Sequence, residues 1–258
     1  MKPSDAIATQ TQMQQQKACV VMPTYNNGGT LRDVIERVLN YSTDVIVVND
    51  GCTDDSAEIL ALFGERITVV DYGKNRGKGY ALKQGFKKAK QMGFDYAITI
   101  DSDGQHFPED IPLFVKALEQ HPGALIVGSR NLKQENMPGK NSFANKFSNF
   151  WFKLQTWIDL PDTQTGYRLY TLKKLPHIFS ARYEAELSLL VFSVWRGTEI
   201  VPIKVNVFYP KAEERVTHFR PFWDFFRISV LNTILCLIAL VYGWPSILIH
   251  KLFGRKDV

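Results

Sequence analysis

Short apolar runs alternate with amphipathic segments along the first half of the chain. Five runs have the length and composition of buried strands: residues 18–23, 44–50, 67–72, 95–103 and 124–130. The segments between them repeat apolar residues at helical spacing: residues 29–41, 54–64, 78–93 and 108–121. This alternation predicts an α/β fold, with parallel strands that helices cover on both faces.

The pattern changes after the last of these strands. Residues 141–160 are helical and rich in aromatic side chains, and residues 162–170 form a polar turn that leads into a short strand. Residues 184–197 have helical periodicity, and residues 199–210 alternate like a strand. There is no internal repeat and no linker long enough to separate two domains. We therefore expect residues 18–215 to fold as one unit.

The two ends of the chain differ from this unit. Residues 1–17 are polar and rich in glutamine, and they lack the apolar centre of a signal peptide, so we expect a disordered tail. Residues 228–249 carry no charge, a borderline length for one transmembrane helix. Aromatic residues and arginines interleave just before them, as in interfacial segments. We expect residues 216–258 to contact a membrane, in its plane or across it, and the alternative is a buried core helix.

The bulk composition adds little to this picture. Of the 258 residues, 45% are hydrophobic and 22% charged, which is typical of a packed globular protein. The net charge of +5 favours anionic partners such as phosphates or a membrane surface. No stripe of lysine and arginine or known binding motif indicates nucleic acid. Three scattered cysteines argue against a disulfide framework and for a reducing compartment.

Polar residues cluster where the predicted strands end. Four clusters follow four different strands: residues 24–27, 49–51, 101–103 and 128–130. In a parallel sheet the carboxyl ends of the strands meet at one edge, where ligands bind. We therefore expect these four clusters to form one site.

Asp101 and Asp103 carry the clearest chemistry among these clusters. Strand alternation would point both carboxylates the same way, and like charges that close favour a bound cation. Gln105 adds a neutral oxygen and His106 a further contact. Oxygen-rich sites of this kind suit Mg²⁺ or Mn²⁺ shared with substrate phosphates. The alternative is that both aspartates cap the helix that begins near Pro108.

Residues 75–82, with the sequence NRGKGYAL, form a glycine-rich turn at a helix start. Backbone N–H groups and the helix dipole attract phosphate at such a turn, and Lys78 adds a positive charge; a plain turn with surface lysines is the alternative. The first strand ends in PTYNNGG instead of Gly-x-Gly-x-x-Gly, which disfavours a dinucleotide-binding enzyme. Asp50 is available to a base or ribose, or else only forms a turn beside Gly51.

The chain resembles the family 2 glycosyltransferases. The motifs that carry the resemblance are, in order, PTYNN, VVNDGCTDDS, GKGYALKQG, DSDGQHFPED, GSR and DTQTGYRLY. The nearest subgroup resembles the dolichyl- or polyprenyl-phosphate mannose and glucose synthases. The resemblance implies a GT-A-type, Rossmann-like fold with a mixed sheet. It also implies metal-dependent, inverting transfer of a sugar from a UDP- or GDP-sugar to a lipid acceptor, at the cytoplasmic side of the membrane.

The resemblance also assigns roles to particular residues. It places around the nucleotide-sugar Pro23, Tyr25, Asn27, Val48, Asp50, Lys78 and the Asp101-Ser102-Asp103 motif. Asp103 and Gln105 are the expected metal ligands, with Asp101 beside them, and Arg130 would face the sugar or the phosphates. The chain has Asn27 where the subgroup usually has glutamate, and Asn49 where it has aspartate. It also lacks the late Gly-Glu-Ser-Lys signature, for which Arg215 is the one plausible counterpart.

The expected chemistry concerns the charge that builds on a departing diphosphate. A metal held by Asp103 and Gln105 would neutralise that charge, assisted by Arg215 and by His218 or Lys78. A lipid phosphate, whose second pKa is about 6, attacks without a base, whereas a hydroxyl acceptor needs one.

Three carboxylates are candidates for that base: Glu184, Glu186 and Asp162. The two glutamates could instead be first-turn acids that the helix dipole favours. Arg168 is expected to bind an acceptor phosphate or to pair with an acidic residue. A hydroxyl of a glycan or glycolipid is an alternative acceptor. Alternative functions are a sugar nucleotidyltransferase, whose arginine-rich first loop is missing from PTYNNGGT, and a non-catalytic membrane adaptor.

Overall fold

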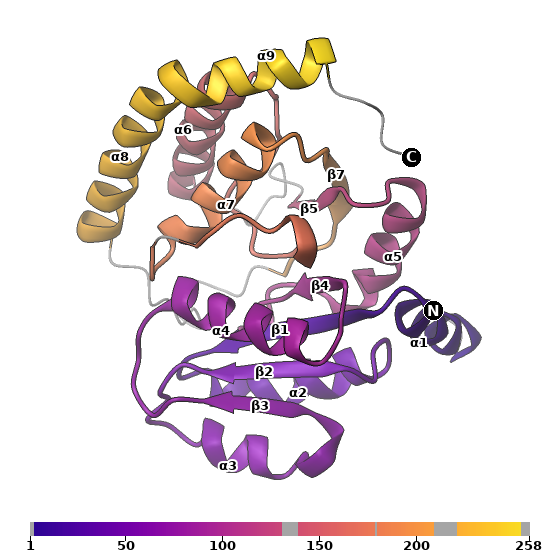
Figure 1. The fold of residues 1–258 in the computed structure, drawn as a ribbon. Helices are drawn as coiled ribbons and strands as arrows, with labels where there is room; N and C mark the ends of the chain where they lie inside the picture. Colours follow the sequence, from indigo (N-terminus) through magenta and orange to yellow (C-terminus); the bar gives the residue numbers. More distant parts are fainter. Residues whose placement is uncertain (1–2, 131–138, 179, 209–220, 254–258) are drawn as a thin grey trace.

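The computed structural model describes residues 3–130, 139–178, 180–208 and 221–253 (Figure 1). Seven strands form one sheet in the order β3-β2-β1-β4-β6-β5-β7. Their bounds are β1 Ala18–Thr24, β2 Val45–Asn49, β3 Thr68–Asp71, β4 Tyr96–Thr99, β5 Leu125–Arg130, β6 Arg168–Thr171 and β7 Ile200–Val205. The pairings are parallel except those of β6, which runs antiparallel to both β4 and β5. The predicted mixed, mostly parallel sheet is confirmed.

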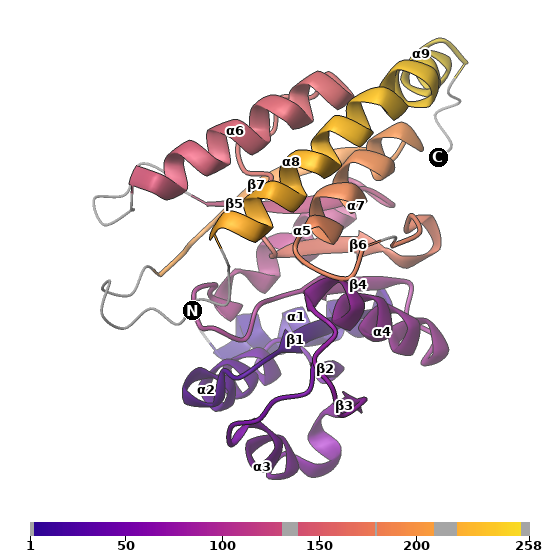
Figure 2. The same cartoon turned by 90° about the vertical axis from the view of Figure 1, so that its left-hand side faces the viewer.

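Helices cover both faces of this sheet (Figures 1 and 2). One face is covered by α1 (Pro3–Gln15), α2 (Gly28–Leu39) and α5 (Ile111–Gln120), and the other by α4 (Lys78–Gln91) and α7 (Glu184–Trp195). The short α3 (Ser56–Ala61) contacts α2, and α6 (Gly139–Thr156) contacts α7. Short 3-10 turns lie at Gly64–Arg66, Pro108–Asp110 and Leu172–Lys174. Both faces of the sheet are therefore buried, which is why its central strands are continuous apolar runs.

The contact between α4 and the sheet is close because of one glycine. Gly85 lies on the buried side of α4, and a Cβ atom there would come within 2.4 Å of the Val21 side chain and 3.1 Å of Val48. This approach carries Leu82 and Phe86 into the core between α4 and the sheet. Helix α4 begins at Lys78, close to the edge of the sheet on which the polar clusters lie.

The N-terminal segment is not the expected tail. Residues 3–15 form helix α1, which contacts α5 and β1. Met13 is buried in the core, and the Gln10 amide donates a hydrogen bond of 2.9 Å to the Leu39 carbonyl. The prediction was wrong because alanine and glutamine favour helices. Buried Met13 and Thr9, partly buried Ala6 and the hydrogen bond of Gln10 dock this largely polar helix on the body.

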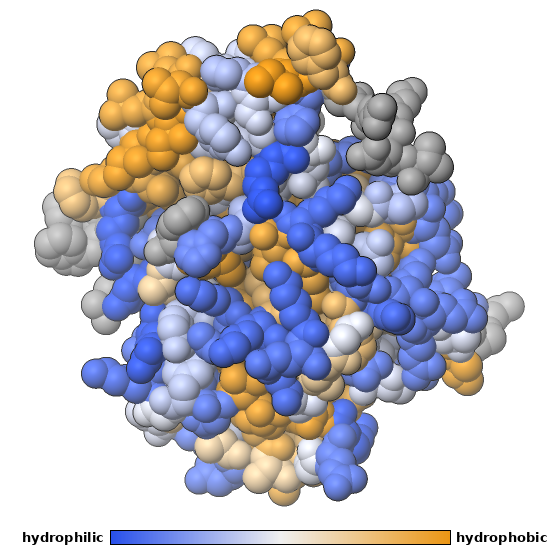
Figure 3. All heavy atoms as spheres, in the orientation of Figure 1, coloured by the Kyte–Doolittle hydropathy of each residue, from blue (hydrophilic) through white to orange (hydrophobic). Residues whose placement is uncertain are grey.

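The C-terminal part continues as one bent helical segment. Helix α8 (Pro221–Ile238) leads through a π-helical turn (Ala239–Gly243) into α9 (Trp244–Phe253). Within the described part of the chain, residues 226–253 form the one helix that is long and apolar enough to cross a membrane. Figure 3 shows apolar residues gathered over α8 and α9 on the face in view. This segment is therefore apolar on the outside as well as the inside.

Candidate functional site

The polar clusters predicted to converge do lie along one edge of the sheet. Because β1, β2, β4 and β5 all run in the same direction, their carboxyl ends meet there. Strand β4 ends at Thr99, and residues 101–104 form a turn beyond it. Strand alternation therefore does not set the directions of Asp101 and Asp103. Their surroundings differ, and each is described in turn.

Asp101 belongs to a three-residue ion cluster. The Lys78 ammonium lies 2.7 Å from the Asp101 carboxylate and 3.1 Å from that of Glu186. Burial raises the pKa of Asp101, but Lys78, together with His106 and Arg130, lowers it more, so its pKa lies below the usual range. Gly166 packs directly on the cluster, because a Cβ atom there would come within 2.7 Å of both Asp101 and Lys78. The cluster ties together the first turns of α4 and α7 and the turn after β4.

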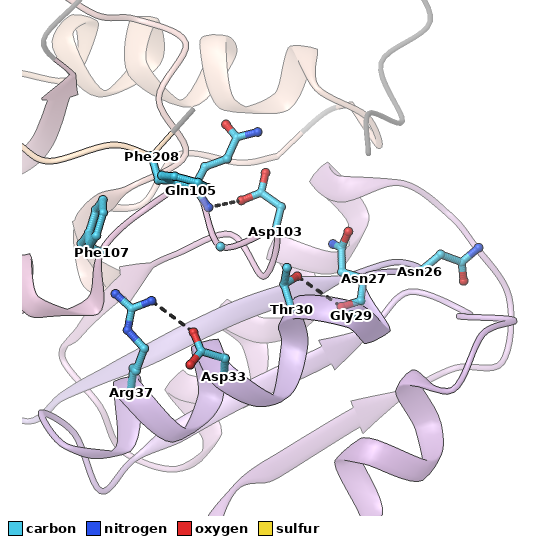
Figure 4. A pocket seen from close by; sticks show the side chains of 11 residues that line it. Asn26, Asn27, Gly29, Thr30, Asp33, Arg37, Asp103, Gln105, Phe107 and Phe208 are labelled. Carbon is cyan, nitrogen blue, oxygen red and sulfur yellow. Dashed lines mark hydrogen bonds and ion pairs between the residues drawn. The ribbon is translucent and has the colours of Figure 1, made fainter. Parts of the chain in front are cut away.

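Asp103 lies at the opening of a pocket of about 530 Å³ (Figure 4). The pocket is lined by Asn26, Asn27, Gly29, Thr30, Asp33, Arg37, Asp103, Gly104, Gln105, Phe107 and Phe208. The Asp103 carboxylate accepts a hydrogen bond of 3.0 Å from the Gln105 backbone N–H. Burial and the neighbouring Asp101 raise the pKa of Asp103 to about 6. A cation in the pocket would relieve this unfavourable charge.

The donor set fits a metal that is shared with a substrate. Two carboxylates, of Asp101 and Asp103, and the Gln105 amide supply oxygen atoms, and Lys78 already pairs with the first. Among the described residues, no group of three or more His, Cys, Asp and Glu side chains is placed to hold a metal ion. Mg²⁺ commonly takes one or two carboxylates and completes its shell with phosphate oxygens and water. The capping alternative is wrong, because Phe107 and Asp110 occupy the N-cap positions of the helices that follow.

Asp50 has a different role from the predicted one. Its carboxylate accepts hydrogen bonds from the Tyr72 hydroxyl (2.7 Å), the Asn75 amide (3.2 Å) and the backbone N–H groups of Arg76 (2.7 Å) and Gly77 (2.8 Å). The side chain is buried, and these four bonds use its acceptor capacity. The direct contact of Asp50 with a base or ribose is therefore corrected to support of the glycine-rich loop. For the same reason, the N–H groups of Arg76 and Gly77 are not free for phosphate.

Two more residues assigned to the nucleotide are structural. Ser102 is fully buried, and its hydroxyl donates to the Pro23 carbonyl (3.2 Å) and accepts from the Asn27 amide (2.9 Å). Val48 is fully buried beneath α4. A nucleotide contact through either side chain is therefore wrong. Asn27 does line the pocket, and Tyr25 is half-buried in the loop between β1 and α2.

Arg130 forms a two-point ion pair at the end of β5. Its guanidinium lies 2.6 Å and 3.0 Å from the two carboxylate oxygens of Asp162, which also accepts the Gln164 N–H at 3.1 Å. Burial raises the pKa of Asp162, but Arg130 lowers it more, so the carboxylate stays ionised. Asp162 is therefore held as a partner of Arg130, and its assignment as a general base stays a prediction.

Arg168 is buried inside the protein. Its guanidinium donates to the backbone carbonyls of Glu186 (2.6 Å) and Thr163 (2.9 Å) and to the Tyr170 hydroxyl (3.2 Å). Because its side chain is fully buried, a contact with an acceptor phosphate is wrong. The alternative, that Arg168 pairs with an acidic residue, is also wrong. The hydrogen-bond acceptors of its guanidinium are two backbone carbonyls and a hydroxyl, and none of them is a carboxylate.

The remaining predicted residues separate in space. Glu184 pairs with Arg227 of α8 at 3.3 Å, and Glu186 pairs with Lys78, so the two candidate bases of one helical turn face different partners. Both lie in the first turn of α7, as the first-turn alternative predicts. Arg215 and His218 fall outside the described residues.

Sequence reasoning treated His106 as a side contact and did not mention Gly166 as a site residue. His106 is buried, its Nδ1 atom has no hydrogen-bond partner, and its Nε2 atom lies 3.5 Å from the Thr165 hydroxyl. Burial lowers the pKa of His106 to about 4, so it is neutral near neutral pH. The sequence signal for Gly166 is its place within DTQTGYRLY, because a glycine next to a strand often marks a position where another group approaches the backbone closely.

A mostly parallel sheet with an acidic turn beyond a central strand, next to an open pocket, defines a class of α/β enzymes that bind their ligands at the carboxyl edge. Comparison with known proteins identifies the group within this class. The model of the glycosyl transferase family 2 matches residues 19–179. The chain belongs to this family and is a glycosyltransferase.

Several characterised relatives act on lipid-linked substrates according to their names. The UDP-N-acetylglucosamine–dolichyl-phosphate N-acetylglucosaminyltransferase of Methanococcus voltae is 28% identical over 213 residues, which is 74% of this chain and 85% of the relative. The undecaprenyl-phosphate mannosyltransferase of Micrococcus luteus is 27% identical over 208 residues (74% and 83%). The polyprenol monophosphomannose synthase of Mycolicibacterium smegmatis is 30% identical over 206 residues (74% and 77%).

Solved structures confirm the fold. Glucosyl-3-phosphoglycerate synthase from Mycobacterium tuberculosis, in complex with Mn²⁺, UDP and phosphoglyceric acid, superposes with a TM-score of 0.67. The match is 19% identical and covers 91% of this chain and 82% of the other. The predicted GT-A-type architecture is thus confirmed at the level of the fold.

Proposed function

We propose that this glycosyltransferase moves a sugar from a nucleotide-sugar to a polyprenyl phosphate, with the help of Mg²⁺ or Mn²⁺, at the cytoplasmic surface of a membrane. The names of the relatives support a lipid phosphate acceptor, because they contain dolichyl-phosphate, undecaprenyl-phosphate or polyprenol monophosphomannose. A neighbour in fold was crystallised with Mn²⁺ and UDP, and another complex of it with Mg²⁺ and UDP, which supports the cation.

The observation that carries the phosphate acceptor is the state of the acidic side chains. Each of the three carboxylates considered as a general base is already ion-paired: Asp162 with Arg130, Glu184 with Arg227 and Glu186 with Lys78. A hydroxyl acceptor must lose a proton to a base, whereas a phosphate monoester is largely ionised near neutral pH. The described site therefore suits an acceptor that brings its own negative oxygen.

The residues of the acidic turn have separate tasks in this proposal. Asp103 and Gln105 would hold the metal, and Lys78 keeps Asp101 ionised and fixed beside them. The bound metal would neutralise the charge that develops on the departing diphosphate. Asp50 holds the glycine-rich loop through its four hydrogen bonds, so the wall of the donor site is formed before the donor binds.

The proposal is tested by a donor screen. UDP- and GDP-sugars labelled in the sugar are incubated with Mn²⁺, purified enzyme and an extracted lipid fraction, and the label that enters the organic phase is counted. We expect transfer from one nucleotide class, into a product that mild acid cleaves as a sugar phosphate. A product that resists mild acid would indicate a hydroxyl acceptor, and label left on a nucleotide would indicate a nucleotidyltransferase.

A matched pair of variants tests the metal ligand. Asp103→Asn should lower turnover by on the order of 10²–10³, because the leaving group loses its charge compensation. Asp33→Asn, an exposed change in the same pocket, should leave turnover within a few-fold. Near-native activity of Asp103→Asn at added Mn²⁺ would rule out the proposed ligand.

A further inference from the structure

We propose that α6, α8 and α9 form one platform that lies in a single leaflet of a membrane, with α8 and α9 along the surface instead of across the bilayer. This inference deepens the proposed function, which requires a lipid acceptor. The platform is defined by its exposed apolar side chains: Phe150, Leu154 and Trp157 at the end of α6, and Phe226, Val230, Ile234, Leu237, Leu240, Val241, Leu248 and Leu252 along α8 and α9.

The segment 226–253 is apolar on two opposite sides. Its inward side is buried at a spacing of three or four residues: Asn232, Leu235, Ala239, Gly243 and Ile247. Its outward side remains exposed, with Val241 at 80% and Leu237 at 62%. A surface helix of a globular protein carries its charges on the outward side, whereas the only charged residues between 226 and 253 are Arg227, Lys251 and, when protonated, His250. A large exposed apolar surface of this kind marks an interaction site.

The inward side is fixed to the protein along its length. The Gln155 amide of α6 donates to the side-chain oxygen of Asn232 (3.2 Å), and the Trp244 indole donates to the Leu154 carbonyl (3.2 Å). The Ser246 hydroxyl donates to the Trp195 carbonyl of α7. Gly243 packs on the same tryptophan, since a Cβ atom there would lie 2.4 Å from its ring. A helix that left the body to span a bilayer would break each of these contacts.

The shape of the segment also favours the in-plane arrangement. The π-helical turn and Pro245 separate α8 from α9, and the two pieces run in different directions over the body of the protein (Figures 1 and 2). A transmembrane helix needs about 20 consecutive residues in one direction, and α8 has 18 and α9 has 10. The 28 residues 226–253 reach that length only across the bend between the two helices.

Charge identifies a lipid surface as the occupant. Helices α6, α8 and α9 contain five basic residues (Lys140, Lys146, Lys153, Arg227 and Lys251) and one acidic residue, Asp224. Two of the basic residues are paired with carboxylates outside these helices, Lys153 with Asp159 and Arg227 with Glu184. At the rim of the platform, Trp157 stacks on Trp244 (5.8 Å between ring centroids), and the Lys251 ammonium lies 5.6 Å from the Trp157 ring. Tryptophan and lysine placed together in this way are typical of the headgroup level of a membrane. The excess of basic over acidic residues in these helices favours anionic lipids.

The first test measures binding to vesicles by flotation, with phosphatidylcholine alone or mixed with phosphatidylglycerol. We expect the full-length protein to float with both and more strongly with the anionic mixture. Val241→Asp and Phe150→Asp should each weaken binding about tenfold, since each removes one apolar side chain from the lipid. Leu62→Asp is the matched control and should change nothing, because Leu62 is 70% exposed at the C-terminal end of α3. Helix α3 lies at the opposite end of the molecule from α8 and α9 (Figure 1).

The role of α6 separates this inference from a simple C-terminal anchor. If only α8 and α9 entered the lipid, Phe150→Asp would float like the wild type, and the platform as defined would be wrong. If the lipid-free protein were a dimer that Phe150→Asp and Val241→Asp dissociate, a second copy would be the occupant. Thermal melts of each variant verify that the fold is intact.

The second test locates the two ends of the chain. Epitope tags at the N- and C-termini are probed with protease in sealed membrane vesicles. The in-plane arrangement predicts that both tags lie on the same side, and tags on opposite sides would establish a transmembrane helix instead. Flotation and sidedness do not depend on catalysis. Membrane binding without sugar transfer would therefore refute the proposed function alone, and transfer without binding would refute the platform alone.

Discussion

Lys78 and Asp101 form the central ion pair of the site, with 2.7 Å between the ammonium and the carboxylate. Lys78 is the first residue of α4, and Asp101 follows the end of β4. The ion pair therefore links these two elements at the same edge of the sheet. Both side chains are largely shielded from solvent, and Glu186 completes the cluster. The cluster has a net negative charge, which a cation near Asp103 would balance.

Replacing the lysine should damage both stability and activity. Lys78→Gln leaves two buried carboxylates without their counter-charge, and breaking such a pair costs about 3–5 kcal/mol of unfolding free energy. Denaturant unfolding and sugar transfer measure the two effects. Lys83→Gln, on the exposed side of the same helix, is the control and should resemble the wild type. Equal stability of both variants would mean that the ion cluster contributes little.

Gly166 should tolerate no side chain. Gly166→Ala would press a methyl group against Asp101 and Lys78, each 2.7 Å from the added Cβ atom. We expect a loss of about 1–3 kcal/mol in stability from overpacking, together with lower turnover because the carboxylate must shift. Gly29→Ala is the control: a Cβ atom there meets no atom within 4 Å, and alanine should stabilise α2 by about 0.5–1 kcal/mol. A wild-type activity of Gly166→Ala would show that the cluster can move without consequence.

The carboxylate of Asp50 should control the order of the glycine-rich loop. In Asp50→Asn, an amide NH₂ would face donors of residues 75–77, and each unmatched buried group costs about 1–3 kcal/mol. We expect faster amide hydrogen exchange in residues 72–78 and a higher KM for the nucleotide-sugar. Asp55→Asn, an exposed change in the same sheet-edge region, should leave exchange in this loop unaltered. If exchange in Asp50→Asn matched the wild type, the loop would be held by other contacts.

His106 should make stability depend on pH under acidic conditions. Its pKa is lowered from 6.5 to about 4 by burial, so the folded state binds fewer protons than the unfolded state between these values. Its contribution to stability is complete above pH 6.5 and is lost as the pH falls toward 4, by up to about 1.4 kcal/mol per pH unit. Melting curves of His106→Asn should therefore have a smaller slope in this window than those of the wild type. Parallel slopes would contradict the assignment.

The strands and helices of the α/β unit follow from periodicity, because each apolar run is buried on both faces. The antiparallel insertion of β6 between β4 and β5 does not follow from periodicity, since strand direction depends on pairing between distant residues. The resemblance to a known family supplied the mixed sheet. Helix α1 was missed because few of its side chains, Met13, Thr9 and Ala6 among them, pack against the body, and its other contacts are made by polar glutamines.

The candidate site was predicted in position better than in detail. The residues of the acidic turn and the loops around it do lie at one edge, because parallel strands require it. The partners of individual side chains were not predictable, since Asp50, Arg130 and Arg168 could have faced a ligand or the protein itself with the same local sequence. In the structure Asp50 and Arg168 are buried, Arg130 is partly exposed, and each of the three contacts protein groups.

Two glutamates in the first turn of α7 form ion pairs with different parts of the protein. Glu184 holds Arg227 on the lipid-facing helix, and two residues later Glu186 holds Lys78 beside the acidic turn. A single turn of α7 therefore connects α8, the helix proposed to contact lipid, with the ion cluster of Lys78, Asp101 and Glu186. Solubilising agents that displace α8 should consequently alter catalysis even when the donor pocket is untouched, so the choice of detergent becomes a variable of the enzyme assay itself.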